Sequence, residues 1–277
     1  MITALLQKKI PAARTRNLEV NLYMSPPPPI AIREQLREER FNVVWTKELN
    51  RVFADVAPYY DRANNVASLG LWNRFLEAFM SVVELRPGQR TLDVCAGTNA
   101  IGIALLRREP TLDVHAIDRS AEMQAVGRER AAARGFHIHS VIGDVHKLPF
   151  PDNHFDVVTL QFASRHLKVR TVFSEILRVL KPGGHFYHCD MLRPANPVVE
   201  KLYYTYLRMC LAFTGFLFRS DESALNCKKY FINALEMFYS AAELSDLLRE
   251  LGYCDVSAKS VFVGMIGCHS AAKPQPR

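Results

Sequence analysis

The sequence predicts an α/β protein with a Rossmann-like, doubly wound and mostly parallel sheet. The first observation is an alternation between residues 91 and 189, where short apolar runs alternate with segments whose apolar residues recur at helical spacing. The second is composition: of the 277 residues, 49% are hydrophobic and 23% are charged. This balance is typical of a packed globule and excludes a disordered or coiled-coil chain.

Five strands and the helices between them are expected in order along this region. The strands are short buried-type runs at 91–95, 112–117, 137–142, 155–160 and 185–189. The helices, which carry apolar residues at helical spacing, are expected at 72–83, 101–108, 121–134 and 172–180. Pro87-Gly88 ends the first helix, and the turn from Lys181 to Gly184 ends the last. Strands separated by helices in this way form a parallel sheet.

The C-terminal part departs from this rhythm. An amphipathic helix is expected at 241–251, followed by an antiparallel hairpin made of 253–257 and 261–268. The segment from about 191 to 240 is then a helical insertion at the carboxyl side of the sheet, where open α/β sheets bind ligands. Its aromatic stretch 202–218 is expected to form a lid or substrate wall, with a plain core helix as the open alternative. This stretch is 17 residues long and contains Arg208, so it is too short and too polar to span a bilayer.

The N-terminal residues 1–40 are predicted to be a basic, Pro-rich tail, and the folded domain is placed at 41–277. The first 24 residues hold four basic side chains and one acid, Glu19, and four prolines follow from Pro26 to Pro29. Residues 31–40 are expected to form a charged, exposed helix. A targeting segment and a partner-binding tail both remain open for 1–40. The absence of an apolar stretch in the first 24 residues argues against a secretory signal, and six cysteines without a CxxC pair favour a cytoplasmic location.

Charge and metal-ligand patterns limit the classes of partner. The net charge is +7, but basic and acidic residues are interleaved, so we expect no nucleic acid partner. Contact between the basic surface and anionic lipid, peripheral to a membrane, is expected instead. No metal site is predicted, because His185 and His188 face opposite sides of a strand. His137 and His139 share a face but have no third ligand near them in sequence.

The turn after the first strand carries the first candidate binding residues. It runs from Asp93 to Asn99 and includes Gly97 and Thr98. A tight turn of this kind lets backbone N–H groups and a helix N-terminus approach a ligand. The dinucleotide pattern G-x-G-x-x-G is not matched, because Asn99 occupies the place of the second glycine, although Asn tolerates the same left-handed backbone.

Two further acids follow the next strands. Asp118 ends the second strand, 25 residues after Asp93, where an acid can bind both hydroxyls of a ribose. Gly143-Asp144 ends the third strand and could reach an adenine amino group. Each acid alone could equally be a helix N-cap. Three such positions at three strand ends argue together for a nucleoside-containing cofactor.

These motifs resemble those of class I S-adenosylmethionine-dependent methyltransferases. The segments that carry the likeness are LDVCAGTNAIG, HAIDRSAEM, GDVHKLPFPDNHFDVV and EILRVLKPGG. More narrowly, the chain is similar to the UbiE/COQ5 family of ubiquinone/menaquinone biosynthesis C-methyltransferases, over roughly residues 50–268. The narrower likeness rests on Tyr60-Asp61, on Leu148 to Asp156, and on the residues that follow the fourth and fifth strands.

The resemblance implies that the cofactor is S-adenosyl-L-methionine and that the substrate is a small lipophilic aromatic ring, usually a prenylated hydroquinone, methylated on carbon. It implies cofactor contacts by Gly97, Thr98, Asp118 and Asp144. Their neighbours at the same three strand ends complete the predicted cofactor site: Asp93, Asn99, Arg119, Gly143 and Val145. The family usually has Gly-Thr-Gly-Asp where this chain has Gly-Thr-Asn-Ala from Gly97 onward.

The predicted catalytic residues are Arg165, His166 and Tyr60. An aromatic carbon attacks a sulfonium methyl group poorly unless a neighbouring hydroxyl is ionised, and His166 is the base of suitable chemical type. Arg165 would stabilise the phenolate, and Tyr60 would flank the methyl group. The family usually has Arg-Asn where this chain has Arg165-His166. The alternatives are that His166 caps the next helix, Arg165 pairs with a surface acid and Tyr60 belongs to the core.

Three functions are compatible with these residues. The first is methyl transfer from S-adenosylmethionine to a ring carbon of a quinol-like acceptor. The second is methylation of another small lipophilic or phenolic metabolite. The third, from a different class, is a non-catalytic scaffold with a methyltransferase-like fold, favoured by Asn99 and by the changed Arg165-His166 pair but opposed by the retained acids. The oligomeric state does not follow from the sequence.

Overall fold

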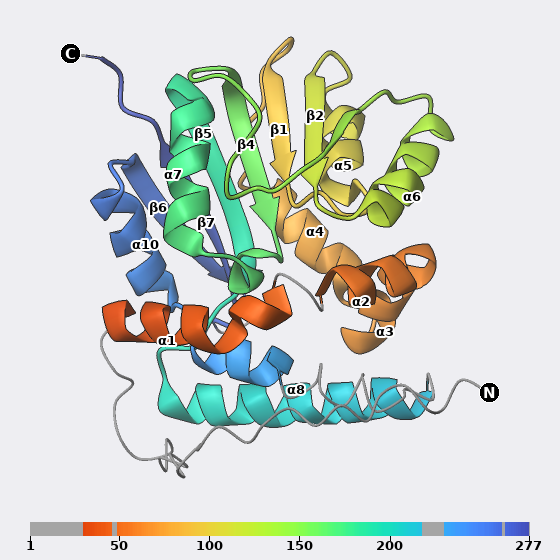
Figure 1. The fold of residues 1–277 in the computed structure, drawn as a ribbon, viewed down its shortest axis with the longest axis vertical. Coiled ribbons are helices and arrows are strands. Elements are labelled where there is room, and N and C mark those ends of the chain that lie inside the picture. Colours follow the sequence, from red (N-terminus) through yellow and green to blue (C-terminus); the bar gives the residue numbers. More distant parts are fainter. Residues whose placement is uncertain (1–29, 46–48, 218–229, 262–263, 277) are drawn as a thin grey trace.

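The predicted α/β architecture is confirmed. The structure is a computed structural model that describes residues 30–45, 49–217, 230–261 and 264–276. Within these residues, seven strands form one sheet in the order β3-β2-β1-β4-β5-β7-β6 (Figure 1). The strands are β1 (Arg90–Val94), β2 (Asp113–Asp118), β3 (His139–Ile142), β4 (Phe155–Gln161), β5 (Leu180–Met191), β6 (Cys254–Val261) and β7 (Ile266–Ala272). The pairs among β1 to β5 are parallel, and β7 runs antiparallel to both β5 and β6.

Helices cover both faces of the sheet, as a doubly wound fold requires. These helices are α4 (Trp72–Met80), which precedes β1, and α5 (Ala100–Arg108), α6 (Ala121–Ala132), α7 (Val169–Val179) and α10 (Ala241–Glu250), which lie between strands. One buried cluster joins α7 and α10 to the sheet, and a second joins α4 and α5 to the opposite face. The four parallel strands β1, β2, β4 and β5 are therefore buried on two sides, which explains why they read as short, nearly continuous apolar runs.

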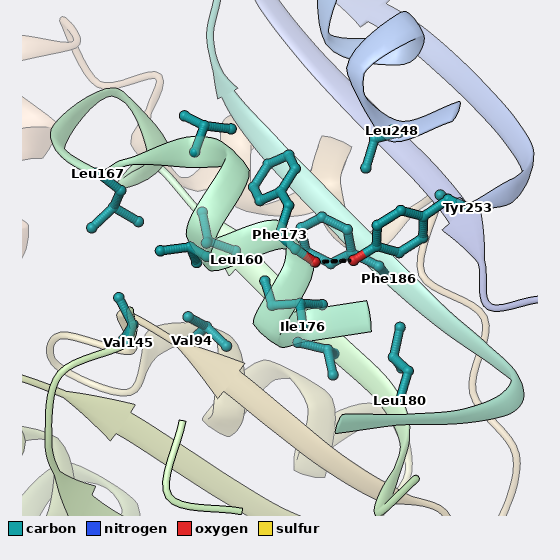
Figure 2. Packing of buried hydrophobic residues seen from close by; sticks show 14 of the residues in the cluster. Val94, Val145, Leu160, Leu167, Phe173, Ile176, Leu180, Phe186, Leu248 and Tyr253 are labelled. Carbon is teal, nitrogen blue, oxygen red and sulfur yellow. Dashed lines mark hydrogen bonds between the residues drawn. The ribbon is translucent and has the colours of Figure 1, made fainter. Parts of the chain in front are cut away.

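Figure 2 shows how the first of these clusters is packed. Phe173 of α7 and Phe186 of β5 are fully buried with their ring centres 5.0 Å apart, and Tyr253 packs beside Phe186. The Tyr253 hydroxyl donates a hydrogen bond of 2.8 Å to the backbone oxygen of Phe173. The hydroxyl thus finds a partner inside an otherwise apolar core, as a buried tyrosine generally must.

The first helix corrects the prediction of an exposed helix at 31–40. Helix α1 (Ile30–Val43) is present, but Arg33 and Arg37 are only 3% and 2% exposed. Arg33 forms an ion pair of 2.7 Å with Glu243 of α10, and the Arg37 guanidinium lies 4.8 Å from the centre of the Phe238 ring. The local charge pattern indicates a solvated face, because the partners of these two arginines lie about 200 residues away in the sequence. Helix α1 therefore packs on the domain, near the carboxyl ends of the strands (Figure 1).

Three short helical segments lie with α1 at this end of the molecule: α2 (Leu49–Val56), η2 (Ala57–Tyr59) and α3 (Tyr60–Ala67). A further short turn, η3 (Ser164–His166), follows β4. These segments precede β1 or follow β4 directly, so the chain passes the carboxyl edge of the sheet several times. They supply side chains that the alternating pattern of strands and helices does not reveal.

The predicted helical insertion is confirmed as α8 (Pro197–Leu217), which lies apart from the sheet (Figure 1). Its buried residues Tyr203, Tyr204 and Leu207 pack against Ile232 and Leu235 in a cluster of their own. Phe218 of the predicted aromatic stretch lies outside the described residues. Among the residues that are described, no helix has both the length and the apolar character needed to cross a membrane.

Candidate active site

A cavity of about 490 Å³ lies at the carboxyl ends of the parallel strands. Many of its polar and small residues follow β1 to β3, and its aromatic residues come from the segment just after α1, from α2 and α3, and from the segment after β4. The lining residues are Asn42, Trp45, Leu49, Phe53, Tyr60, Cys95, Gly97, Asp118, Arg119, Met123, Gly143, Asp144, Val145, His146, Gln161, Phe162, Ala163, His166, Leu167, Lys168 and Thr171. The volume is within the usual range of small-molecule sites, about 300–1,000 Å³.

Asp118 connects the first and second strand ends of the cavity. One carboxylate oxygen accepts the backbone N–H of Gly97 at 2.8 Å, and the other accepts the N–H of Ser120 at 2.8 Å. Burial raises the pKa of Asp118, although these N–H donors oppose the shift. Gly97 has φ +51°, and a Cβ there would meet Met123 at 3.3 Å. A side chain at this position would thus be strained and would press on the cavity wall.

Asn99 adopts the left-handed backbone that a glycine would supply, with φ +57°. Its side chain is fully buried and does not line the cavity. The Asn99 Oδ1 accepts a hydrogen bond of 2.9 Å from Gln124, and the Asn99 amide lies against Gly127, where a Cβ would come within 2.7 Å. Asn99, which stands where the family usually has glycine, therefore does not reduce the volume of the cavity.

Thr98 and Asp93 also face away from the cavity. The Thr98 hydroxyl lies 3.3 Å from both carboxylate oxygens of Asp61 in α3, and Arg130 forms an ion pair with the same carboxylate. Asp93 is a buried residue of β1 and accepts a hydrogen bond of 2.9 Å from Thr159. Burial raises the pKa of Asp93 to about 7. Both residues support the turn from behind and do not line the cavity.

A charged edge forms where β2 and β3 end. The Arg119 guanidinium lies 3.2 Å from a carboxylate oxygen of Asp144 and donates to the backbone oxygen of Trp45 at 3.0 Å. His146 contacts the same oxygen of Asp144 through its backbone N–H at 3.0 Å and its ring at 2.6 Å. Burial raises the pKa of Asp144, but the His146 hydrogen bonds and the Arg119 charge outweigh it and hold the pKa at about 2. Asp144 is therefore an anion at neutral pH.

Aromatic rings form another wall of the cavity. Phe53 packs edge-on against Tyr60 with ring centres 6.2 Å apart, and Phe162 stacks on Trp72 at 5.3 Å. Phe53 also packs against His166, with ring centres 6.3 Å apart. Such a wall suits a flat, apolar ligand, since aromatic side chains offer both area and stacking faces.

His166 lies at this wall and is held by Tyr230. Its Nδ1 is 2.5 Å from the Tyr230 hydroxyl oxygen, which also accepts a hydrogen bond of 2.8 Å from the Trp45 indole N–H. Burial lowers the pKa of His166 well below its ordinary value, and the charges of Arg165 and Arg37 lower it further. His166 is therefore a neutral imidazole at pH 7, and its contact with Tyr230 orients the ring.

Arg165 does not line the cavity, and it does not pair with a surface acid either. Its guanidinium donates at 2.6 Å to Asp190, which is fully buried on β5, and at 2.8 Å to the backbone oxygen of Phe162. Ser164 donates to the other oxygen of Asp190 at 2.6 Å. Arg165 is thus half of a buried ion pair that fixes the turn after β4.

Of the residues predicted from sequence, the structure brings eight to the cavity: Tyr60, Gly97, Asp118, Arg119, Gly143, Asp144, Val145 and His166. Four others lie behind its walls: Asp93, Thr98, Asn99 and Arg165. Sequence reasoning missed Trp45, Phe53, His146, Phe162 and Tyr230. Phe162 directly follows β4 and His146 lies in the turn after β3, and these positions could have indicated them. No local signal points to Trp45 or Tyr230.

The donor set fits a nucleoside-containing cofactor. Asp118 and Asp144 are carboxylates at two neighbouring strand ends, which suits the hydroxyls of a ribose and the amino group of a purine. The close backbone approach at Gly97 leaves room for a ligand between them.

Comparisons with known proteins agree with this geometry. Residues 41–273 match the model of the ubiE/COQ5 methyltransferase family. The chain is 33% identical over 247 residues to the demethylmenaquinone methyltransferase of Anoxybacillus flavithermus, covering 88% of this chain and all of that protein. It is 33% identical over 235 residues to the ubiquinone/menaquinone biosynthesis C-methyltransferase UbiE of Ectopseudomonas mendocina, covering 82% and 90%.

Among solved structures, the fold is similar to that of a Haloferax volcanii methyltransferase determined in complex with the Trm112 activator. The TM-score is 0.58 with 17% identity, and the match covers 80% of this chain and 98% of that one. At this identity the likeness concerns the fold alone.

Proposed function

The chain belongs to the ubiE/COQ5 methyltransferase family, and from this premise we propose that it transfers a methyl group from S-adenosylmethionine to a ring carbon of a prenylated hydroquinone. Relatives at 33% identity are named for demethylmenaquinone and for ubiquinone/menaquinone biosynthesis. The observation that carries the proposal is one cavity with two carboxylates at its strand ends and a neutral, oriented histidine on its aromatic wall.

The carboxylate side of the cavity is proposed to hold the cofactor. Asp118 would bind the ribose hydroxyls, since its oxygens are already oriented by two backbone N–H groups. Asp144, an anion fixed by His146 and Arg119, would accept from the adenine amino group, while Gly143 and Val145 line the same edge. When bound, S-adenosylmethionine supplies an activated sulfonium methyl group.

The aromatic side is proposed to hold the acceptor, with His166 as general base. With its proton on Nδ1, the ring donates to Tyr230 and leaves Nε2 free to accept the proton of an acceptor hydroxyl. The resulting phenolate would deliver electron density to the ring carbon, which would form the new bond to the methyl carbon as the sulfur–methyl bond breaks and S-adenosylhomocysteine leaves. Release of the proton on that ring carbon to solvent would restore aromaticity, and His166 would return the proton that it holds to the phenolate oxygen. Tyr60 and Phe53 would flank the acceptor ring.

Arg165 is proposed as a positioning residue rather than one that touches the substrate. It is separated from the cavity by its ion pair with Asp190, yet it directly precedes His166. Its charge helps to keep the His166 ring neutral in the folded protein. The residue thus acts on the reaction through His166.

The test is isothermal titration of the full chain with S-adenosylmethionine and S-adenosylhomocysteine, followed by methyl transfer to a demethylquinol extract. We expect micromolar binding that falls at least about tenfold in Asp118→Ala, since a charge-assisted pair of hydrogen bonds is worth about 1.5–3 kcal/mol each. Asp246→Ala, which removes an exposed carboxylate, is the matched control.

A second variant separates catalysis from cofactor binding. His166→Gln is expected to bind the cofactor as the wild type does and to lose methyl transfer by about 10²–10⁴-fold. Failure of the wild type to bind either cofactor form would instead support the scaffold function. Binding together with transfer to simple phenols, but not to demethylquinols, would support the second class of acceptor.

Peripheral contact with lipid is proposed through α8. Val198, Leu202 and Met209 are 68%, 66% and 67% exposed, and their spacing of four and seven residues places them on one helix face. A prenylated acceptor resides in the lipid phase, so an apolar helix face would bring the enzyme to it. Sedimentation with anionic phosphatidylglycerol vesicles should retain the wild type and release Leu202→Glu. Equal sedimentation of both proteins would contradict this assignment.

A further inference from the structure

A second cluster of chemically capable side chains lies toward the amino ends of β2 and β3, away from the cavity. Asp113 and His115 are two residues apart on β2 and therefore share a face, and His115 is the direct register partner of His139 on β3. The Nε2 atoms of His115 and His139 lie 3.2 Å and 3.5 Å from the same carboxylate oxygen, Oδ1 of Asp113. None of these residues lines the cavity.

We propose that Asp113, His115 and His139 form a binding site for a divalent transition-metal ion of the zinc type. One ligand atom from each of the three residues lies within 4.8 Å of the others. Two imidazoles and a carboxylate are a donor set that suits zinc, nickel, copper and cobalt rather than calcium or magnesium. The two other ligands, Asp113 and His115, lie on the adjacent strand β2, although neither is near His139 in the sequence.

The distances fit tetrahedral coordination. With metal–ligand bonds of about 2.0–2.1 Å, neighbouring donors of a tetrahedron lie about 3.3 Å apart. The two separations between Asp113 Oδ1 and the imidazole nitrogens, 3.2 Å and 3.5 Å, bracket this value, and all three ligand atoms lie within 4.8 Å of one another.

The surroundings hold the donors in place. Arg90 donates to Oδ2 of Asp113 at 2.7 Å, which orients the carboxylate and leaves Oδ1 facing the two imidazoles. Hydrogen bonding of a ligating carboxylate by such a partner is a regular feature of metal sites. The rings of Phe155 and Phe150 pack edge-on against His115, with centres 5.4 Å and 6.1 Å away, and form an apolar floor.

The fourth position is proposed to be taken by water. His139 is 52% exposed in its side chain, so solvent reaches the site. The ring of His137 also lies near, 4.6 Å from that of His139, but its donors are not among the three that converge. An ion here would join β2 to the edge strand β3, the strand that leads directly to Gly143 and Asp144.

The test is zinc binding to the full-length chain after chelator treatment, measured by competition with a chromophoric indicator. We expect one zinc ion per chain at this site and a rise in the unfolding temperature on zinc addition. Loss of a group that merely orients a ligand costs about 10–100-fold in affinity, so removing a ligand in His139→Ala or Asp113→Asn should cost at least ~100-fold. His185→Ala, which removes a histidine stacked on Tyr187 of β5, should bind zinc as the wild type does.

Cobalt provides an independent readout. Visible d–d bands of tetrahedral cobalt without a thiolate charge-transfer band are expected for the wild type, and they should disappear in His139→Ala. Circular dichroism confirms that each variant is folded; His139 and Asp113 are exposed enough for both to fold. Absence of zinc binding by the wild type, unchanged binding in both ligand variants, or a thiolate band would each overturn the proposal.

Discussion

Replacing Arg165 by Met tests whether this residue is structural or touches the substrate. The substitution keeps an apolar side chain of similar length and removes the guanidinium. Asp190 has no exposed surface, and it would then be a buried carboxylate that retains hydrogen bonds from Ser164 and from the backbone N–H of Met191 but has lost its ion-pair partner. The loss of one partner from a buried ion pair leaves an uncompensated charge, which is costly.

The structure sets the size of the effect. Breaking such a pair costs about 3–5 kcal/mol, so Arg165→Met should lower the midpoint of thermal unfolding by on the order of 6–20 °C. The matched control is Arg170→Met. Arg170 pairs with Glu34 and Glu250 at the surface and is 44% exposed, so its loss should cost no more than about 1 kcal/mol.

A double-variant cycle then isolates the pair. In Arg165→Met/Asp190→Asn both charges are absent, and the loss of stability should be smaller than the sum of the two single losses by about 0.5–3 kcal/mol. Urea unfolding of the four proteins measures this coupling. If Arg165→Met unfolds as the wild type does while methyl transfer disappears, the structural role is refuted and direct contact with the substrate is supported.

Three further predictions concern other parts of the chain. Asn99→Gly should lose only the Gln124 hydrogen bond, about 0.5–1.5 kcal/mol, whereas Asn99→Ala should lose about 1–2 kcal/mol more because alanine is strained at φ +57°. Equal unfolding free energies of the two variants would contradict this. Stability should decline as the pH falls below about 6.5, because burial lowers the pKa of His166 in the folded protein while the unfolded chain still binds the proton. His166 contributes a slope of up to ~1.4 kcal/mol per pH unit to the unfolding free energy, and this contribution should disappear in His166→Gln. Tyr253→Phe should lose about 0.5–1.5 kcal/mol with the hydrogen bond to Phe173, and an unchanged urea midpoint would show that this bond contributes nothing.

The sequence predicted those site residues that sit at the ends of parallel strands. Asp118, Gly143 and Asp144 follow strands whose order and direction are set by local apolar patterns. The carboxyl ends of parallel strands meet at one edge, so their proximity needs no knowledge of the tertiary packing. The left-handed backbone of Asn99 was likewise predictable from the turn alone.

The other half of the site could not be predicted in this way. Tyr230 contacts His166 from 64 positions away, and Trp45 contacts Tyr230 from 185 positions away. Arg37 donates at 3.1 Å to the backbone oxygen of Arg165, 128 positions away. These residues lie on helices whose approach to the sheet edge depends on packing between distant segments, for which the single sequence carries no periodic signal.

Arg165 and His166, in the turn that follows β4, show that two adjacent residues of one sequence motif can have different roles in a site. Arg165 and His166 are adjacent, but they lie in a 3₁₀ turn, where successive side chains point about 120° apart. One is therefore directed at Asp190 inside the domain and the other at the cavity. The pair still acts together, because the buried guanidinium lowers the pKa of the imidazole beside it. Loss of the Arg165 charge should consequently raise the pKa of His166, and the acid limb of the methyl-transfer profile of Arg165→Met should move to higher pH than that of the wild type.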